Sequence, residues 1–286
     1  MKTILPFFLF FSFSVSAQTT RFFISAHQDD WQLFMNPNVY RSIKNNDDKT
    51  VIIHTTAGDA GEGMGKRSYY KAREEGSIRA LRFLTNTYGS GEGLGTEMNE
   101  KRVKLNGHDI LRLNYRNCVV YLLRLPDGNG TGAGYPLHEK KSLQKFYEGK
   151  VENLPSIDNT TTYKNKKDLL KTLEALIKEE QIGNATEIHL ADTDPEQNPD
   201  DHSDHQTSSK LFQDTAKAIG NMRLYLYVNY ASSNKPKNTS DDEFMLCAAT
   251  WGVTTSALSD LDHYSTWDNV HNSWIGRQYY RLIDIN

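Results

Sequence analysis

The sequence has little of several features that mark particular classes of protein. Its only cysteines are Cys118 and Cys247, so at most one intramolecular disulfide can form, which excludes a disulfide scaffold and a four-sulfur metal site. The formal net charge is only -3, so no overall basic field attracts nucleic acid. Beyond residue 17 no apolar run is long enough to cross a bilayer, and no internal repeat is visible. These absences favour a soluble protein with a small or neutral partner.

The chain does contain enough apolar sequence for a large core, and its first 17 residues stand apart. The 286 residues are 37% hydrophobic, which suits a single domain over residues 18–286. Before it, Lys2 precedes an almost wholly apolar run from Ile4 to Val15, and small residues follow up to Ala17. This pattern is typical of a secretory signal peptide cut after Ala17, with an uncleaved anchor as the alternative. We therefore expect a secreted or periplasmic protein without a membrane span after cleavage.

Apolar runs of strand length alternate with amphipathic segments of helix length. Strands are predicted at residues 21–25, 50–56, 117–125, 187–190 and 224–228. Helices are predicted at residues 68–84 and 166–181, and from Ser203 or Asp204, as the cap, to about Ile219. This alternation predicts an α/β fold in which helices cover both faces of a mostly parallel sheet.

Acidic and histidine residues follow four of the predicted strands. They are His27, Asp29 and Asp30 after the first, Asp59 after the second, Asp127 after the third, and the residues from Asp192 to His205 after the fourth. The carboxyl ends of parallel strands share one edge of a sheet, and sites form beyond that edge. The polar segment 127–163 is predicted to be a lid, a binding wall or a mobile surface insertion.

Three of these side chains have the character of a catalytic metal site. His27 and Asp30 are three residues apart at a strand-to-loop junction, so one turn can aim both at the same point. His205 can join them from the fourth loop. Two histidines and one carboxylate with an open position form a common catalytic zinc arrangement, which activates water and polarises a carbonyl.

The neighbours of these candidate ligands supply acid and base groups. Asp29 is a spare carboxylate that can take a proton from water. His202 is a spare imidazole that can hydrogen-bond an oxyanion or protonate a leaving amine, and Asp204 can fix its tautomer. The alternative is structural: an Asp pair after a strand often caps a turn, and a His-x-x-His pair is often a surface pair. The shared sheet edge favours the metal-dependent hydrolase.

The two clusters also resemble signatures of a known family. Residues 26–30, Ala-His-Gln-Asp-Asp, resemble the Ala-His-Pro-Asp-Asp signature of the PIG-L/LmbE-like N-acetylglucosaminyl deacetylases, and residues 202–205, His-Ser-Asp-His, resemble its His-Pro-Asp-His signature. In the same order, residues 55–61 resemble its Thr-x-Gly-Asp turn, residues 73–75 its Arg-Glu helix, and residues 125–128 its Pro-Asp-Gly loop. The resemblance spans about residues 21–230.

The resemblance implies a Rossmann-like fold and removal of acetate from an N-acetylated amino sugar. It implies the same zinc ligands, namely His27, Asp30 and His205. It also implies Asp29 as the general base, with His202 as its electrophilic or acid partner, supported by Asp204. Arg73 and Asp127 are implied to contact sugar hydroxyls.

Some residues depart from the family pattern. Gln28 and Ser203 replace prolines, which makes both turns less rigid, and Trp31 stands where the family commonly has Glu. Trp31 is predicted either to form a sugar-stacking wall or simply to pack beneath the loop. The aromatic C-terminal run from Trp251 to Tyr280 either closes one side of a glycan pocket or, as the pattern favours, packs as a terminal helix. Within it, His271 is a candidate substrate contact.

The sequence thus predicts a secreted deacetylase with one Zn²⁺ per chain, although other divalent metals also bind such ligands. Its expected partner is an N-acetylated amino sugar or glycan, and no nucleic acid. Two rival functions stay open. One is a metal-dependent amidase for an acyl amine that is not a sugar, and the other is a secreted glycan-binding protein with a vestigial metal site.

Overall fold

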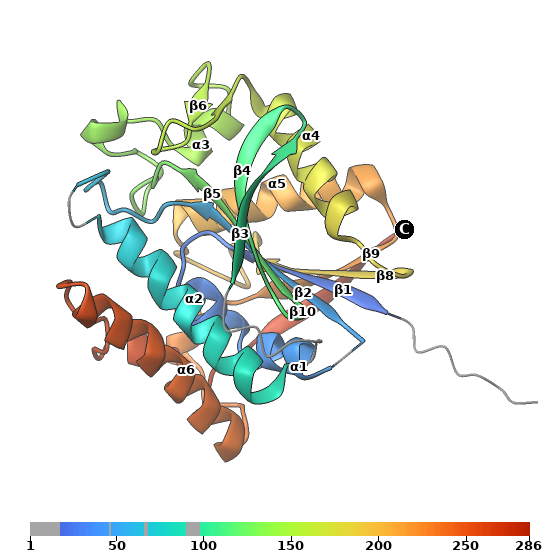
Figure 1. Ribbon diagram of the computed structural model, residues 1–286, viewed down its shortest axis with the longest axis vertical. Helices are drawn as coiled ribbons and strands as arrows, with labels where there is room; N and C mark the ends of the chain where they lie inside the picture. The colour runs from blue at the N-terminus through green and yellow to red at the C-terminus, as the bar shows by residue number, and fades with distance from the viewer. Residues whose placement is uncertain (1–17, 46, 66–67, 90–97) are drawn as a thin grey trace, which may run out of the picture.

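The computed structural model describes residues 18–286 except 46, 66–67 and 90–97, so the predicted signal peptide lies outside the described residues. A single eight-stranded sheet runs through the described chain in the order β10-β9-β8-β1-β2-β5-β4-β3 (Figure 1). Its parallel strands are β1 (Thr19–Ser25), β2 (Lys49–Thr56), β5 (Cys118–Leu125), β8 (Ala185–Ala191) and β9 (Met222–Tyr227). The antiparallel strands are β3 (Asn99–Leu105), β4 (His108–Tyr115) and β10 (Tyr280–Ile285).

Helices cover both faces of the sheet, as predicted for an α/β fold. One face carries α3 (Leu143–Tyr147), α4 (Lys166–Glu180) and α5 (Ser203–Ile219), and the other carries α1 (Asn38–Lys44), α2 (Tyr69–Tyr88) and α6 (Asp241–Asp260) (Figure 1). Successive residues of a strand point to opposite faces. Phe22 and Ile24 of β1 therefore enter the α4–α5 core, whereas Phe23 enters the α2–α6 core.

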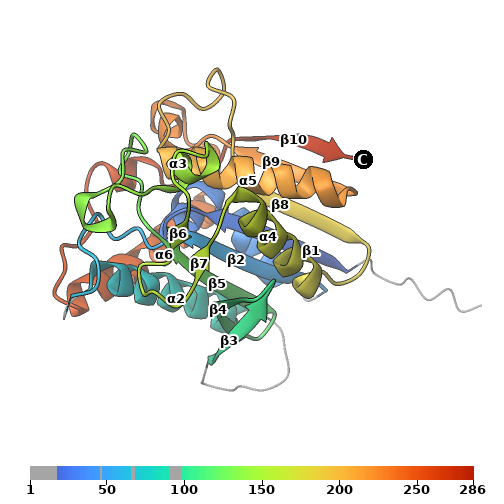
Figure 2. The ribbon, with the colours of Figure 1, turned by 90° about the horizontal axis from the view of Figure 1, so that it is seen from above.

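The order of the strands creates the place for a site. From β1 the chain moves outward to β2 and β5, and it then returns to the other side of β1 for β8 and β9. The carboxyl ends of these strands and their loops lie on one side of the molecule, at the left of Figure 2. A crevice forms where the direction of winding reverses, which here is between β1 and β8.

The predicted strands and helices are present with small shifts at their ends, but the β3–β4 hairpin was not predicted. β3 lies at the exposed edge of the sheet and is rich in charged residues, so it lacks the apolar alternation of a half-buried strand. The sequence feature that could have predicted this hairpin is the dipeptide Asn106-Gly107. Both residues have positive φ angles, of 50° and 86°, and they make the tight turn between the two strands.

The preference for a packed terminal helix in the aromatic C-terminal run was wrong. Helix α6 includes Trp251 but ends at Asp260. The following residues are irregular apart from the short turn η4 (His271–Ser273), and β10 then adds an edge strand beside β9. This stretch is rich in Asp, Asn, Ser and Thr, which favour turns over helix interiors.

Segment 127–163 has secondary structure of its own and packs against the core. It contains a short turn η2 (Pro136–His138), α3, and a two-stranded sheet of β6 (Leu154–Pro155) and β7 (Thr162–Tyr163). Leu143, Phe146 and Tyr163 are buried in the α4–α5 core. The segment therefore forms a packed layer above the end of β5.

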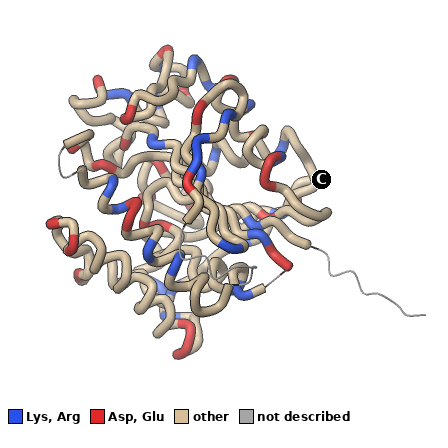
Figure 3. Tube along the Cα trace, in the orientation of Figure 1, with Lys and Arg blue, Asp and Glu red and all other residues tan. Residues whose placement is uncertain are grey.

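The remaining sequence expectations concern cysteines, charge and membrane segments. Cys118 and Cys247 are both free and buried, so they form no disulfide. Basic and acidic residues are interspersed along the described chain rather than gathered by sign (Figure 3). None of the described helices combines the length and apolar character needed to cross a membrane.

Candidate metal centre and active site

Two loops bring the three predicted metal ligands together in the crevice between β1 and β8. His27 and Asp30 follow β1, and His205 lies in the first turn of α5. His205 Nε2 lies 3.2 Å from His27 Nδ1 and 3.1 Å from Asp30 Oδ1, and His27 Nδ1 lies 3.9 Å from the same oxygen. Ligand atoms around a tetrahedral ion with bonds of about 2.0–2.1 Å are ~3.3 Å apart. The three buried donors therefore fit one zinc-sized ion.

Each of the two imidazoles has a carboxylate at its outer nitrogen. Asp201 Oδ1 lies 2.7 Å from Nδ1 of His205, and Asp204 Oδ2 lies 3.3 Å from Nε2 of His27. A proton on each outer nitrogen leaves the lone pairs of the inner nitrogens facing each other. Two lone pairs at this distance need a cation or a proton between them, so the donor set fits a metal ion.

The charges around the donors also favour a cation. Burial disfavours the imidazolium form of His205, but Asp30 and Asp201 outweigh it and raise the pKa of His205 well above its usual value. Burial also disfavours the ionised form of Asp30, yet His205 and His27 hold the pKa of Asp30 well below its usual range. The crevice thus stabilises positive charge where the three donors converge.

Asp201 belongs to this centre although the sequence reasoning gave it no role. Its side chain is fully buried, and its Oδ2 accepts hydrogen bonds from Asn198 Nδ2 at 2.8 Å and Asn229 Nδ2 at 3.3 Å. The only sequence signal was an acidic residue four positions before a candidate histidine ligand. Asn198 lies in the loop after β8 and Asn229 lies two residues beyond the end of β9, so a tertiary relationship holds Asp201 in place.

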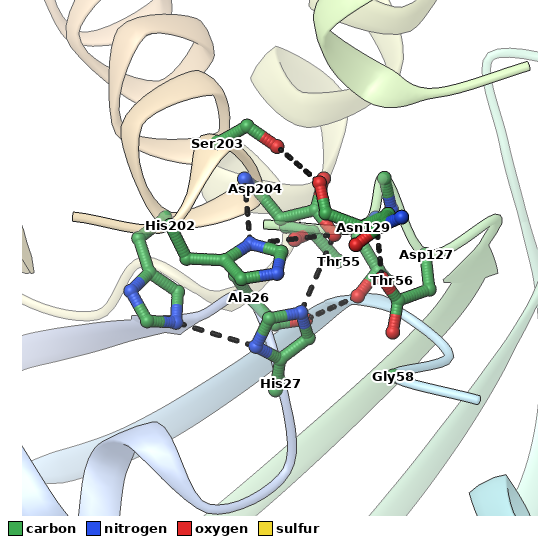
Figure 4. Close-up of polar contacts among 12 residues, drawn as sticks. Ala26, His27, Thr55, Thr56, Gly58, Asp127, Asn129, His202, Ser203 and Asp204 are labelled. Carbon is green, nitrogen blue, oxygen red and sulfur yellow. Dashed lines mark hydrogen bonds and ion pairs between the residues drawn. The ribbon is translucent and has the colours of Figure 1, made fainter. Parts of the chain in front are cut away.

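Asp204 supports a different histidine from the one expected. Its carboxylate lies 3.3 Å from His27 Nε2 and accepts the backbone N–H of Gly128 at 2.9 Å, whereas His202 Nδ1 is 3.9 Å away (Figure 4). The backbone N–H of Asp204 instead donates to His202 Nδ1 at 3.1 Å. His202, rather than Ser203 or Asp204, is therefore the N-cap of α5.

This cap determines which nitrogen of His202 faces the site. With Nδ1 accepting a backbone N–H, the neutral ring carries its proton on Nε2. Burial, together with the nearby His27, lowers the pKa of His202 to about 4. His202 is therefore a neutral imidazole with an N–H available to an acceptor.

A second group of potential ligands lies beside the first and shares His27. Its other members are Asp127, His202 and Asp204, with ligand atoms within 4.8 Å of one another. Most of these atoms already make hydrogen bonds: Asp127 accepts from the backbone of Ala60 at 3.1 Å and of Asn129 at 2.8 Å. The group of His27, Asp30 and His205 is the better metal site because its inner donor atoms face one another and not other protein groups.

Asp29 lies at the edge of the crevice and pairs with Arg73. Nη2 of Arg73 donates to Asp29 Oδ1, and Nη1 donates to the carbonyl of Gly58 at 2.8 Å. Burial opposes ionisation of Asp29, but the guanidinium outweighs it and lowers the pKa of this carboxyl. Gly58 has a positive φ of 52°, and a Cβ there would lie 2.6 Å from Nη1. Arg73 thus holds the predicted base as well as lining the cavity.

A cavity of about 230 Å³ opens above these groups. Asp29, Arg73, Asp127 and His202 line it, as does His271 from the C-terminal region. Residues to which the sequence gave no role complete part of the wall, namely Leu33, Phe34, Ala60, Tyr69 and Tyr230. Thr266 and Trp274 come from the C-terminal run, for which closing one side of a pocket was the alternative to a terminal helix. The indole of Trp274 stacks on Tyr230, with ring centres 5.1 Å apart. The cavity therefore has acidic groups on one side and aromatic rings on another.

Trp31 is a correction to the sequence interpretation. It begins the π-helical turn η1 (Trp31–Met35) and is 0% exposed, so it cannot form a sugar-stacking wall. Its Nε1 donates to Ser77 Oγ at 2.8 Å within the α2–α6 core. The turn before it is anchored by Gln28, whose buried Nε2 donates to the carbonyl of Ala57 at 3.0 Å. This hydrogen bond restrains the turn where proline is absent.

Comparison with known proteins gives a family match and several distant structural neighbours. No curated protein matches the chain. A solved N,N'-diacetylchitobiose deacetylase from Pyrococcus horikoshii has 15% identity, with 92% of this chain and 83% of that chain covered and a TM-score of 0.49. A zinc-inhibited form of a teicoplanin deacetylase has 12% identity, 92% and 96% coverage, and a TM-score of 0.46.

The family match covers the parts of the chain that build the centre. The family model described as GlcNAc-PI de-N-acetylase matches residues 22–216, which include β2, β5, β8, the second half of β1 and nearly all of α5. Both histidine and aspartate clusters lie within the match. The chain belongs to the PIG-L family of de-N-acetylases.

Proposed function

We propose that this chain is a secreted, zinc-dependent deacetylase that hydrolyses the N-acetyl amide of an N-acetylglucosamine-type sugar or glycan. The observation that carries the proposal is the convergence of His27, Asp30 and His205, with Asp29 beside them, in a de-N-acetylase family. The reaction adds one water across the amide and yields acetate and a free amino sugar. Export is supported by the pattern of residues 1–17 alone.

The residues that would hold zinc are His27, Asp30 and His205. A zinc ion there supplies a Lewis acid, which polarises the amide carbonyl and lowers the pKa of a water molecule to about 7. Asp201 and Asp204 fix the two imidazoles with their lone pairs directed inward. Cobalt, nickel and iron also accept imidazole and carboxylate ligands, so the physiological metal is set by supply as well as by the site.

Asp29 acts as the base. Its ion pair with Arg73 keeps the carboxylate ionised and fixes its direction at the edge of the cavity. From there it takes the proton that water loses as the water oxygen attacks the carbonyl carbon. When the C–N bond breaks, the same proton passes to the amine nitrogen, which regenerates the Asp29 carboxylate.

His202 stabilises the negative charge that develops on the carbonyl oxygen. Its Nδ1 is engaged by the backbone of Asp204, so Nε2 carries the proton that can be donated. A fixed donor that needs no reorganisation lowers the barrier most where charge develops, by about 3 kcal/mol for one such group. Because the His202 ring is neutral, it can donate this hydrogen bond without repelling a bound zinc ion.

The cavity suits a single sugar ring in size and chemistry. Its volume of about 230 Å³ is smaller than the ~300–1,000 Å³ of pockets for drug-sized ligands. Trp274 and Tyr230 line it with aromatic rings that suit the apolar side of a sugar ring, and Asp127 and Arg73 offer polar groups to its hydroxyls. His271, at the rim, is proposed as a further hydroxyl contact.

Acetate release across a panel of amides tests this proposal and its rivals. The panel contains N-acetylglucosamine and its oligomers, N-acetylated peptides and long-chain amides. We expect release from the sugars, together with about one metal ion per chain. A preference for peptides or lipids would instead support the amidase for other acyl amines.

Two variants separate the enzyme from a glycan-binding protein with a vestigial metal site. Asp29→Ala should lower kcat by about 10²–10⁴-fold while metal content is retained, because it removes only the base. Asp109→Ala, at an exposed carboxylate on β4, is the matched control and should change neither. Unchanged turnover in Asp29→Ala would overturn the mechanism.

A further inference from the structure

The chain between α6 and β10 supplies part of the cavity although it lies beyond the family match. The match ends at residue 216, whereas Thr266, His271 and Trp274 all line the cavity. In Figure 2 the loops after α6 lie at the left, beside the loops that follow the parallel strands. Part of the cavity wall is therefore formed by chain beyond the family match.

The same segment exposes apolar side chains next in sequence to residues that line the cavity. Tyr264 is 96% exposed, Val270 62% and Trp267 49%, and they flank the cavity-lining Thr266 in sequence. An isolated exposed apolar residue is ordinary, but three within seven residues at the mouth of a site indicate a contact surface. We call Tyr264, Trp267 and Val270 the rim platform.

Contacts with the helices beneath hold the platform in place. The ring of His263 lies 5.3 Å from that of Tyr69 at the start of α2. The ring of His271 stacks on Trp251 of α6, and Trp251 Nε1 donates to Asn272 Oδ1 at 3.2 Å. A Cβ on Gly252 would lie 3.7 Å from the indole of Trp267, so this ring rests against α6.

The charge of the segment restricts its partner. From residue 257 to residue 276 the sequence contains no Lys or Arg, but it contains Asp260, Asp262 and Asp268. Phosphate groups of an anionic lipid surface need Lys or Arg side chains, and this stretch has none. Within the cavity, Arg73 is already paired with Asp29. An uncharged partner with planar apolar faces therefore fits best.

We propose that the rim platform is a subsite for further sugar units of a neutral glycan chain whose acetylated residue occupies the cavity. This inference rests on the proposed deacetylase function and specifies its substrate as an oligomer or polymer. The cavity has room for one ring, so the next rings of a bound chain must lie outside it, and the exposed rings of Trp267 and Tyr264 flank the cavity-lining Thr266. Sugar rings stack on such faces through their apolar C–H surfaces.

The test compares substrates of different chain length in two platform variants. Acetate release is measured for the monomer to the hexamer of N-acetylglucosamine with the wild type, Trp267→Ala and Tyr264→Ala. We expect the wild-type kcat/KM to rise with chain length. In Trp267→Ala the hexamer-to-monomer ratio should fall about tenfold, mainly through KM, as expected when binding alone is lost. Tyr88→Ala, at an exposed aromatic on α2, is the control and should keep the wild-type ratio.

Binding of the hexamer to the Asp29→Asn chain, measured by calorimetry with and without Trp267→Ala, separates the two proposals. Absence of acetate from every sugar, with hexamer binding that depends on Trp267, would sink the enzyme but keep the subsite. Acetate release without dependence on length or on Trp267 would overturn the subsite and keep the enzyme. Sedimentation of the wild type with phosphatidylcholine vesicles, lost in Trp267→Ala, would also overturn the glycan subsite. It would mean that the rim platform binds a membrane surface.

Discussion

The carboxylate of Asp201 lies 2.7 Å from Nδ1 of His205, while Nε2 of the same ring faces Asp30 at 3.1 Å. One imidazole therefore connects an outer carboxylate to the point where the metal donors converge. The outer carboxylate fixes the tautomer and increases the basicity of the inner nitrogen. The centre thus depends on residues that are not themselves ligands.

Asp201→Asn should weaken metal binding about 10–100-fold, because the amide no longer fixes the His205 tautomer by charge. Zinc affinity measured against a competing chelator would show this directly. Glu196→Ala, an exposed acidic residue in the same loop, should keep wild-type affinity. Equal affinity in Asp201→Asn and the wild type would mean that Asp201 is only a structural residue.

Gly58→Ala should lower kcat while leaving metal content intact. The new Cβ would lie 2.6 Å from Nη1 of Arg73 and must displace the guanidinium that holds Asp29. We expect a loss of about tenfold or more, since a misplaced catalytic group can cost ~10²-fold. Gly107→Ala is the matched control, because it has a positive φ of 86° but no atom within 4 Å of the added Cβ. If both variants lost kcat equally, backbone strain alone would explain the effect.

Zinc should raise the melting temperature of the metal-free chain, and a chelator should reverse the change. The ion stabilises only the folded state, by about 2.7 kcal/mol at a concentration 100 times its Kd. His205→Ala removes one donor and should abolish the shift measured by calorimetry. A zinc-dependent shift of wild-type size in His205→Ala would place the bound ion elsewhere.

The stability of the wild type should fall steeply in acid because of Glu180. This buried carboxylate pairs with Arg112 at 2.7 Å and Lys49 at 2.6 Å, and accepts a hydrogen bond from Tyr121. Burial opposes its ionisation, but these partners lower its pKa from 4.5 to about 2. A lowered folded-state pKa contributes stability above pH 4.5 that is lost as pH falls toward 2. The contribution is on the order of 3 kcal/mol.

Urea unfolding of the wild type and Glu180→Gln between pH 7 and pH 3 checks this prediction. The variant should be less stable at pH 7, and the difference should shrink as the pH falls below 4.5. Glu139→Gln, at an exposed carboxylate, serves as the control. A difference that stays constant over this range would show that the ionisation of Glu180 is not responsible.

The thiols of Cys118 and Cys247 should be unreactive in the folded protein. Both are free and buried, and burial raises the pKa of each to about 12. Only the thiolate attacks a disulfide reagent, so the native chain should react slowly. Two thiols should become titratable after unfolding without reductant. If none were released, the two cysteines would be bridged.

Much of the fold could be predicted because its signals are local. The apolar run of β5 and the apolar stripe of α4 can both be read directly from the sequence. The start of α4 is local as well, because the Asn165 side chain accepts a hydrogen bond from the backbone N–H of Asp168. The convergence of His27, Asp30 and His205 could also be predicted, since a parallel sheet brings the loops after β1 and β8 to one edge. By itself, the sequence therefore determined the layers and the edge of the sheet at which these polar residues gather.

The rest depended on contacts between distant segments. The sequence around Trp31 does not show whether the indole contacts a sugar or packs in the core. It is the packing of α2 and α6 over η1 that buries the ring. The pairing of Arg73 with Asp29 and of Asp204 with His27 joins residues 44 and 177 positions apart, where no periodicity can relate them. The C-terminal wall around Trp274 is likewise irregular chain. Tertiary packing decided which neighbour each polar group found, because buried polar groups must be paired wherever the fold places them.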